Sequence, residues 1–473
     1  MNDSLKNREL VKPDGVIEEA LYEVRQKIYP RAVGGWFARW RVAMVLATQI
    51  VFYGTPWLTL NARQAVLFDL AARKFYIFGL VLWPQDFIYL AVLLVISALS
   101  LFLFTAVAGR LWCGYACPQT VYTEIFMWIE RKIEGDRPHR IELDGGPMSL
   151  KKLCLKTAKH AAWIALSLWT GFTFVGYFTP IRELAGEVTT LRLGPWEAFW
   201  ILFYSFATYG NAGWMREQVC KYMCPYARFQ SAMFDSDTLI ITYDSARGEP
   251  RGRRSRSTDP KAAGLGDCID CGICVQVCPT GIDIRKGLQY ECIGCAACID
   301  GCNQVMKKMD YAPGLIRYST ENALRHTWNF AGMMKRTLRP RVLVYTTILW
   351  TIIAAAGVSL TLRIPLKVDV IRDRAGLSRE VGGGMIENVY RLQIMNTEEI
   401  PHRYRIEAAG IPTLAIAGSD SVEVPAAATL MAPVRLRIEA DEARPGSHRI
   451  EFRIEALDAP QIEARERSTF VVR

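Results

Sequence analysis

Two runs of cysteines give this sequence its clearest chemistry. Each run has the spacing C-x2-C-x2-C-x3-C, in which thiolate sulfurs hold [4Fe–4S] clusters. Three thiolates of a run bind one cluster, and the fourth binds the cluster of the other run. We therefore predict two ligand sets, the first formed by Cys268, Cys271, Cys274 and Cys302 and the second by Cys278, Cys292, Cys295 and Cys298.

Structural zinc sites and disulfides are the alternatives for these eight cysteines. Zinc ribbons use cysteines in pairs, so three in succession at this spacing favour clusters. A proline is expected after the fourth cysteine of each run; Pro279 follows Cys278, whereas Asn303 follows Cys302. Asn303 is not a predicted ligand, so this departure leaves the assignment unchanged. Because iron–sulfur clusters need a reducing compartment, we expect residues 268–302 to lie in the cytoplasm.

Four further cysteines form two C-x3-C-P motifs, each at the cytoplasmic end of an apolar run. Residues four apart share a face of a helix, so each motif is expected to present two thiols at one depth. Soft thiolates suit Cu(I) or a metal cluster, whereas the alternative is that the thiols only pack. Two matching motifs favour one functional four-thiol site for Cu(I) or a metal cluster, to which Met223 would be a weaker ligand. The site residues are Cys113 and Cys117 in the first motif and Cys220 and Cys224 in the second.

The composition is that of a membrane protein. The chain has 473 residues, of which 51% are hydrophobic, and it contains apolar runs close to the length of about 20 residues that crosses a membrane. Its net charge of +10 does not by itself indicate nucleic acid, because basic residues crowd the cytoplasmic loops of membrane proteins. We predict a five-helix transmembrane bundle and no nucleic-acid partner. The predicted spans are residues 42–60, 87–108, 161–178, 196–212 and 342–360, and the shorter run at 75–83 is predicted to be interfacial or re-entrant.

Basic residues predict the orientation of these spans. The loop after the second span is rich in lysine and arginine, whereas the loops after the first and third spans carry few. Since positive loops stay in the cytoplasm, the N-terminus and the cluster region are expected there and the C-terminus in the periplasm. The predicted location is therefore the bacterial inner membrane, which the chain would cross several times.

Residues 363–473 have a different pattern. Short runs such as residues 390–394 and 448–454 alternate apolar and polar side chains and are separated by turn-forming residues. This alternation is typical of antiparallel strands, and about a hundred residues of it predict an all-β immunoglobulin-like sandwich, here without a disulfide.

The predicted domain organisation follows from these patterns. The chain would consist of a cytoplasmic segment (1–41), four transmembrane helices with the C-x3-C-P motifs (42–235), a bacterial ferredoxin-like 2[4Fe–4S] domain (236–335), a fifth helix (336–362) and the periplasmic sandwich (363–473).

A basic segment at residues 244–262 leads into the first cysteine run. One interpretation is a solvated linker that touches lipid headgroups, and the other is a docking site for an acidic electron donor. The sequence has no G-x-G-x-x-G unit and no pair of histidines within the spans. We therefore expect neither an internal nucleotide-binding domain nor a bis-histidine haem.

The motifs occur in a specific order. They read G-R-L-W-C-G-Y-A-C-P-Q-T at 109–120, C-K-Y-M-C-P-Y-A-R-F-Q at 220–230 and Y-D-S-A-R-G-E-P-R-G at 243–252, followed by the doubled cysteine run. In this order, and over nearly the whole chain, the sequence resembles the cytochrome c oxidase accessory proteins known as CcoG, FixG or RdxA. The resemblance implies a membrane polyferredoxin with two [4Fe–4S] clusters that reduces Cu(II) to Cu(I) while copper is supplied to a cbb-type oxidase.

The same resemblance implies that the C-x3-C-P cysteines handle the copper. It also implies the partners: copper chaperones or transporters and assembly factors of the oxidase, besides the lipid bilayer and a cytoplasmic electron donor that the sequence does not name.

Two other functions stay open. A respiratory relay would carry electrons between quinol or ferredoxin and a periplasmic nitrate or nitrous-oxide reductase without handling copper. A non-redox assembly scaffold would use its clusters only to stabilise the fold. The C-terminal sandwich favours the oxidase-assembly proteins over the respiratory relatives.

Overall fold

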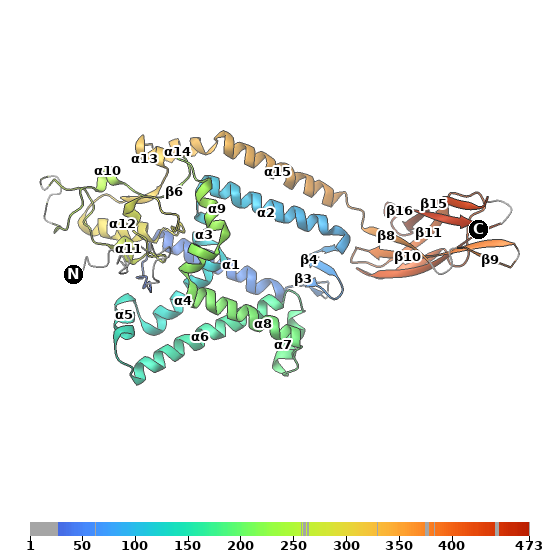
Figure 1. The fold of residues 1–473 in the computed structure, drawn as a ribbon, viewed down its shortest axis with the longest axis horizontal. Helices are drawn as coiled ribbons and strands as arrows, with labels where there is room; N and C mark the ends of the chain where they lie inside the picture. Colours follow the sequence, from blue (N-terminus) through green and yellow to red (C-terminus); the bar gives the residue numbers. More distant parts are fainter. Residues whose placement is uncertain are drawn as a thin grey trace, which may run out of the picture.

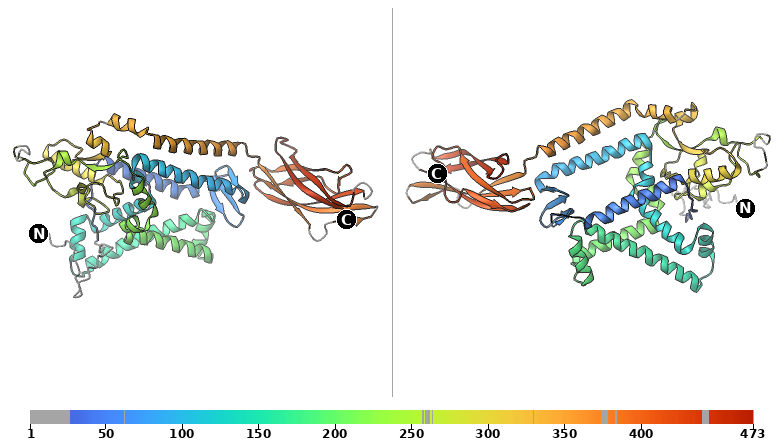
Figure 2. Two further views of the ribbon diagram at one scale, coloured as in Figure 1. Left: turned by 45° about the horizontal axis from the view of Figure 1, so that its top comes forward. Right: turned by 180° about the vertical axis from the view of Figure 1, so that it is seen from behind.

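The fold is an elongated arrangement of three parts, seen in a computed structural model. The structure describes residues 27–61, 63–256, 258, 262, 264–328, 330–373, 378–382, 384–439 and 444–472. A compact unit that contains the doubled cysteine run lies at one end, a β-sandwich lies at the other, and long helices lie between them (Figure 1). Figure 2 shows the same separation from two further directions.

Each of the five predicted apolar runs coincides with a helix. These helices are α1 (Trp36–Gly54), α2 (Phe87–Ala108), α6 (Leu150–Val175), α8 (Pro195–Thr208) and α15 (Pro340–Thr361). Within the described residues, two helical stretches are long and apolar enough to cross a membrane, Pro84–Ala108 and Pro340–Thr361. They indicate membrane association. The five-helix membrane bundle stays a prediction, because α8 has only 14 residues and α6 begins with a lysine-rich turn.

The helices α2 and α15 run antiparallel to each other. Tyr89 at the start of α2 lies 2.9 Å from the hydroxyl of Ser359 at the end of α15. Arg339, at the start of α15, donates to the carbonyl of Ala106 at 2.6 Å. The cysteine-rich unit and the sandwich therefore lie at opposite ends of this helix pair (Figure 1).

The remaining helices connect or cover the long ones. They are α3 (Leu111–Tyr115), α4 (Pro118–Glu134), α5 (Arg137–Gly145), α7 (Ile181–Thr189), α9 (Pro225–Met233), α13 (Glu321–Arg325), α14 (Phe330–Thr337) and the π-helices η3 (Tyr209–Met215) and η4 (Val219–Met223).

The run at 75–83 forms no spanning helix, in agreement with the prediction, and its interfacial or re-entrant position stays a prediction. It forms two strands of a small antiparallel sheet, whose members are β3 (Val66–Asp69), β4 (Lys74–Ile77) and β5 (Leu80–Leu82). Within this run Val81 and Trp83 are buried and pack against Met395 of the sandwich. Asp86 pairs with Arg363 at 2.7 Å beside the same contact.

The cysteine-rich unit has little regular structure. It contains the helices α10 (Ser245–Gly248), α11 (Ile273–Gln276) and α12 (Ala297–Met309) and one antiparallel pair of strands, β6 (Ile240–Tyr243) and β7 (Ile316–Ser319). Loops make up most of the rest. The buried residues of this unit include Cys274 and Cys302, so thiols form part of its core.

The C-terminal part is a sandwich of two antiparallel sheets, which confirms the prediction of an immunoglobulin-like β domain. Tyr390 and Phe452, one from each sheet, are fully buried against each other with ring centroids 5.2 Å apart. Inward-facing residues alternate with exposed ones along the strands, as the sequence pattern requires. One sheet contains β8 (Leu366–Arg372), β9 (Arg379–Val381), β10 (Met385–Asn396), β12 (Ala415–Ile416) and β14 (Thr429–Glu439), and the other contains β11 (His402–Ala409), β13 (Ser421–Val424), β15 (Gly446–Ala456) and β16 (Glu463–Val472).

Candidate metal centres

The first predicted ligand set surrounds one cavity. Tyr243, Arg285 and Met306 line this cavity. All four cysteines of the set line it as well, namely Cys268, Cys271, Cys274 and Cys302. Burial, followed by the other three sulfurs of the set, raises the pKa of Cys302 to about 12. Cys271 is solvent-exposed, unlike the other cysteines of both runs.

The second predicted set has no solvent-exposed member. Burial raises the pKa of Cys298 well above its usual value, and the sulfurs of the other three members, Cys292, Cys295 and Cys278, raise it further. Cys274 of the first set also contributes to this shift, so the two sets are neighbours. The eight cysteines thus gather in the two groups that the spacing predicts.

The donor chemistry fits iron–sulfur clusters. All thirteen cysteines are free, so none of the eight is engaged in a disulfide. Among the described residues, no group of three or more His, Cys, Asp or Glu side chains is arranged to hold a single metal ion. The four cysteines of the first set line one cavity, and three thiolates in succession at this spacing are typical of clusters and not of zinc ribbons. Clusters bound by these cysteines would supply one-electron redox chemistry.

The two C-x3-C-P motifs do not lie on continuous helix faces, which corrects the sequence-based expectation. Cys113 lies in α3, but Cys117 caps the start of α4; Cys220 lies in η4, but Cys224 caps the start of α9. The reason is the proline that follows each second cysteine. Proline favours the first position of a helix and forces the residue before it into an extended conformation, which ends the preceding helix.

Both motifs nevertheless repeat one local geometry. The ψ angles of the capping cysteines are 127° for Cys117 and 110° for Cys224, both in the extended region. The amide of Cys117 donates to the carbonyl of Trp112 at 3.0 Å, and that of Cys224 donates to Val219 at 2.8 Å, so each bond reaches back five residues. The matching motifs are therefore matching structures.

The four thiols of the motifs form one group. Burial, followed by the sulfurs of Cys117, Cys113 and Cys224, raises the pKa of Cys220 to about 12. The four thiols are not arranged around a single metal ion, because no three His, Cys, Asp or Glu side chains among the described residues are arranged in that way. Met223, the weaker predicted ligand, is 58% exposed beside this group.

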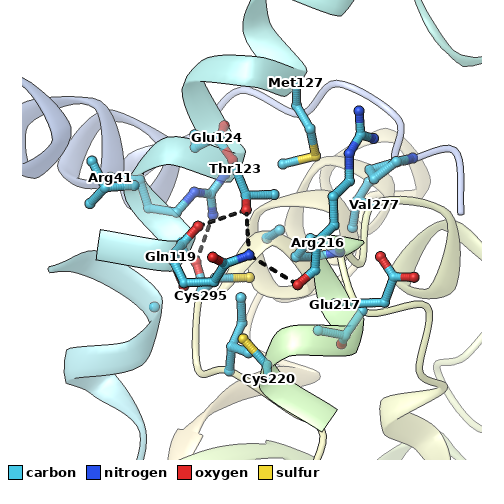
Figure 3. Close-up of a pocket in the computed structure, with 18 of the residues that line it drawn as sticks. Arg41, Gln119, Thr123, Glu124, Met127, Arg216, Glu217, Cys220, Val277 and Cys295 are labelled. Atoms are coloured by element: carbon cyan, nitrogen blue, oxygen red, sulfur yellow. Dashed lines mark hydrogen bonds between the residues drawn. The ribbon is translucent and has the colours of Figure 1, made fainter. Parts of the chain in front are cut away.

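The thiol group adjoins the second ligand set. Cys113 and Cys220 pack against the buried cluster of residues that contains Cys295, and Cys298 packs against the same cluster. Cys220 and Cys295 also line one narrow cavity of about 60 Å³, in which Gln119 donates to the carbonyl of Arg216 at 3.1 Å (Figure 3).

Two glycines make this close approach possible. A Cβ atom on Gly114 would lie 2.7 Å from the carbonyl oxygen of Gly294, and one on Gly294 would lie 2.9 Å from the carbonyl oxygen of Arg110. Gly294 also has a positive φ of 70°, which favours glycine. Arg41 fixes the adjoining turn by donating to the carbonyl of Cys295 at 2.6 Å.

Sequence reasoning missed these three positioning residues. Arg41 could have been identified, because it is a charged residue at the edge of an apolar run, where an unpaired charge would be costly and a partner is expected. Gly114 and Gly294 lie inside cysteine motifs, where glycine is also expected for a tight loop. Nothing in the sequence indicated that the two face each other.

Family models match three parts of the chain. A "4Fe-4S binding domain" matches residues 90–135, which include the first C-x3-C-P motif. A "4Fe-4S dicluster domain" matches residues 215–321, which include the second motif and the doubled cysteine run. An "IG-like fold at C-terminal of FixG" matches residues 356–473. Fold and sites together define an iron–sulfur electron-transfer protein with an immunoglobulin-like domain.

Curated relatives cover most of the chain. The nitrogen fixation protein FixG of Rhizobium meliloti is 39% identical over 84% of this chain and 82% of its own length. Protein RdxA of Cereibacter sphaeroides is 39% identical over 90% of this chain and 92% of its own length. Protein RdxB of the same organism is 37% identical over 84% of this chain and 85% of its own length. The chain belongs to the FixG/RdxA family.

Proposed function

We propose that the protein reduces Cu(II) to Cu(I) at the four thiols of the C-x3-C-P motifs, for copper delivery and assembly of a cbb-type cytochrome c oxidase. One observation carries this proposal: Cys113 and Cys220 pack against the same buried residues as Cys295 and Cys298. A soft-metal site and an electron source thus adjoin each other, with no intervening domain.

The roles of the cysteines follow from this arrangement. The first set, nearest to solvent through Cys271, would hold the outer [4Fe–4S] cluster, and the second set would hold the inner one. The four motif thiols would bind copper. Thiolates are soft ligands and prefer Cu(I), so binding there favours the transfer of one electron to Cu(II).

The proposed topology has five membrane crossings. The N-terminus and the cysteine-rich unit would be cytoplasmic, and the sandwich would be periplasmic. This is supported by the antiparallel pairing of α2 and α15, which separates the two units by the length of one apolar helix. It is also supported by the basic loop after α2. Copper chaperones or transporters and oxidase assembly factors are the proposed partners.

A deletion strain and the purified protein test the proposal together. The strain should lose cbb-type oxidase activity and regain part of it when copper is added, whereas loss of nitrate or nitrous-oxide reduction would indicate a respiratory relay. The purified protein should contain about eight irons, two clusters of four. Stoichiometric zinc, without an EPR signal after reduction by dithionite, would refute the iron–sulfur part of the proposal.

The copper step has a direct assay. Anaerobically reduced protein should convert added Cu(II) to Cu(I), which a Cu(I)-specific chelator reports by its colour. Cys154→Ser is the matched control, because Cys154 is an exposed thiol outside all three sulfur groups. Cys117→Ser should abolish the reaction, and equal rates in both variants would show that copper receives its electrons elsewhere.

A further inference from the structure

The two ligand sets differ in their access to solvent, which gives the electron path a direction. Cys271 of the first set is exposed, whereas Cys295 and Cys298 of the second set lie in the buried region that contacts the motif thiols. The first set, through Cys271, therefore offers the more accessible entry for electrons that end at those thiols. The surface around Cys271 is the place where a donor would bind.

A basic segment is fixed beside this surface. The amide of Gly252 donates to the carbonyl of Cys268 at 3.2 Å, and the amide of Gly266 donates to the carbonyl of Pro250 at 2.8 Å. Gly248 and Gly266 lie in such close contact that a Cβ atom on Gly266 would overlap the backbone of Gly248. These backbone contacts therefore fix the segment beside the first ligand set.

The arginines of this segment divide into two kinds. Arg247 pairs with Asp267 at 2.6 Å, and Arg254 donates to Tyr311 at 3.0 Å, so both hold the segment in place. Arg251, Arg253 and Arg256 are exposed, and we refer to these three as the arginine edge. Their ion pairs are long and exposed, 3.8 Å from Arg251 to Glu249 and 3.5 Å from Arg256 to Asp310. Such pairs hold an arginine weakly, which leaves it available to a partner.

We propose that the arginine edge is the docking surface for a small soluble electron-carrier protein with an acidic surface around its redox centre. Residues 245–256 contain five arginines and one glutamate, so the charge complements such a partner. In each encounter the carrier would be oxidised by one electron and this chain reduced by one. Complementary charge would raise the association rate and orient the carrier toward Cys271. The inference rests on the proposed use of the eight cysteines as cluster ligands.

A lipid surface is the competing partner for exposed arginines. The position of the segment argues against it. The adjoining helix α10 lies at the end of the molecule opposite to the sandwich, beyond the ends of α2 and α15 (Figure 1). A protein that approaches from the cytoplasm can reach this end, whereas headgroups would meet the helix ends first.

The test uses the full-length protein in nanodiscs of neutral phosphatidylcholine and a purified, reduced, acidic plant-type [2Fe–2S] ferredoxin as the probe. The bleaching of the cluster absorbance is followed after rapid mixing at low salt. We expect the R251E/R253E/R256E variant to be reduced at least tenfold more slowly than the parent, and the parent rate to fall as salt rises. Equal rates in parent and variant would overturn the proposal.

Controls separate docking from folding and from copper chemistry. The R403E/R405E/R467E variant changes the net charge equally, but on the sandwich, and should keep the parent rate. Dithionite, which needs no docking surface, should reduce all variants equally. If the charge-reversed variant loses iron, the R251Q/R253Q/R256Q variant is used in its place. Its affinity for oxidised ferredoxin is measured by thermophoresis, and an affinity equal to that of the parent would overturn the proposal.

Two further measurements distinguish the remaining outcomes. The same preparations are reduced with dithionite, freed of its excess by gel filtration and then mixed with Cu(II), so the absence of Cu(II) reduction counts against the copper proposal alone. Binding to vesicles of phosphatidylglycerol is compared as well. Loss of vesicle binding in R251E/R253E/R256E, with an unchanged rate of reduction by ferredoxin, would assign the arginine edge to lipid and overturn the docking proposal.

Discussion

The cysteine-rich unit and the sandwich lie at opposite ends of the molecule and are held together differently. The sandwich has two hydrogen-bonded sheets around twenty buried apolar residues. The described part of the cysteine-rich unit has a single pair of strands and two small cores of ten and four buried residues, three of which are Cys274, Cys295 and Cys302. We therefore expect the sandwich to fold on apolar burial alone and the cysteine-rich unit to need bound clusters for its stability.

The comparison teaches how rigidity is distributed. Apolar alternation stabilises a strand locally and repeatedly, so the sandwich needs no cofactor. A loop-rich unit gains its stability when thiolates bind a common centre, so its structure and its redox function depend on the same eight residues.

Loss of a cluster ligand should unfold one unit and spare the other. In Cys298→Ser, the amides of α12 should lose about 4 kcal/mol or more of protection against hydrogen exchange, because the loops around the second set lose their centre. Amides of β10 and β14 should stay protected as in the parent. Full protection of α12 in an iron-free preparation would show that the cysteine-rich unit folds without clusters.

A cavity in the sandwich should have the opposite effect. Leu436 is fully buried in β14, so Leu436→Ala should lower the free energy of unfolding of the sandwich by about 2–5 kcal/mol. Denaturant unfolding monitored by hydrogen exchange measures this free energy. Leu457→Ala, a substitution of an exposed leucine, is the control. Iron content and Cu(II) reduction should be unchanged. A loss of iron in Leu436→Ala would mean that the two units are energetically coupled.

The glycine contact should affect electron transfer without affecting either unit. A Cβ atom on Gly114 would press against Gly294 and the Cα atom of Cys295, so Gly114→Ala should move the thiols away from the second set. We expect Cu(II) reduction to slow about tenfold, equivalent to about 1.4 kcal/mol in the barrier. EPR spectra of both clusters should persist. Gly186→Ala, where nothing lies within 4 Å, is the control, and parent-like rates in both would refute the role of the contact.

The smallest predicted effect is a pH dependence confined to the sandwich. Burial lowers the pKa of His402, but hydrogen bonds from its ring nitrogens to Glu398 and Asp458, at 2.8 and 2.7 Å, raise it more, so the net shift is upward. The resulting stabilisation is fully present below about pH 6.5 and is lost as the pH rises through the raised pKa of the folded state.

The free energy of unfolding of the sandwich should therefore decrease between pH 6 and pH 8.5. Denaturant melts of the sandwich signal at several pH values measure it. His402→Gln should remove the dependence, and His448→Gln should leave it unchanged. Stability that increases with pH in the parent would contradict the assigned direction.

The sequence predicted what depends on local pattern. Strand alternation in residues 363–473 identified the sandwich, and the cysteine spacing identified the two groups of sulfurs that the structure brings together. These patterns could be read because each one recurs within a short stretch of chain.

Packing between distant segments could not be predicted. The split of each C-x3-C-P motif follows from Pro118 and Pro225, which start new helices, yet a four-residue spacing alone also fits one continuous helix. The run at 75–83 is apolar because Val81 and Trp83 meet Met395, a residue more than 300 positions later. The contact of Gly114 with Gly294 likewise joins segments far apart in the chain.

The central claim is that Cu(II) receives its electron at the four motif thiols. The most direct measurement mixes anaerobically reduced protein with Cu(II) and records the reoxidation of the cluster absorbance together with the appearance of chelated Cu(I). The account predicts that the parent and Cys154→Ser react alike. Cys220→Ser and Cys224→Ser should keep both cluster EPR signals but lose the reaction by at least about 100-fold, since a hard hydroxyl replaces a soft ligand. Reoxidation by Cu(II) at the parent rate in both of these variants would contradict the claim.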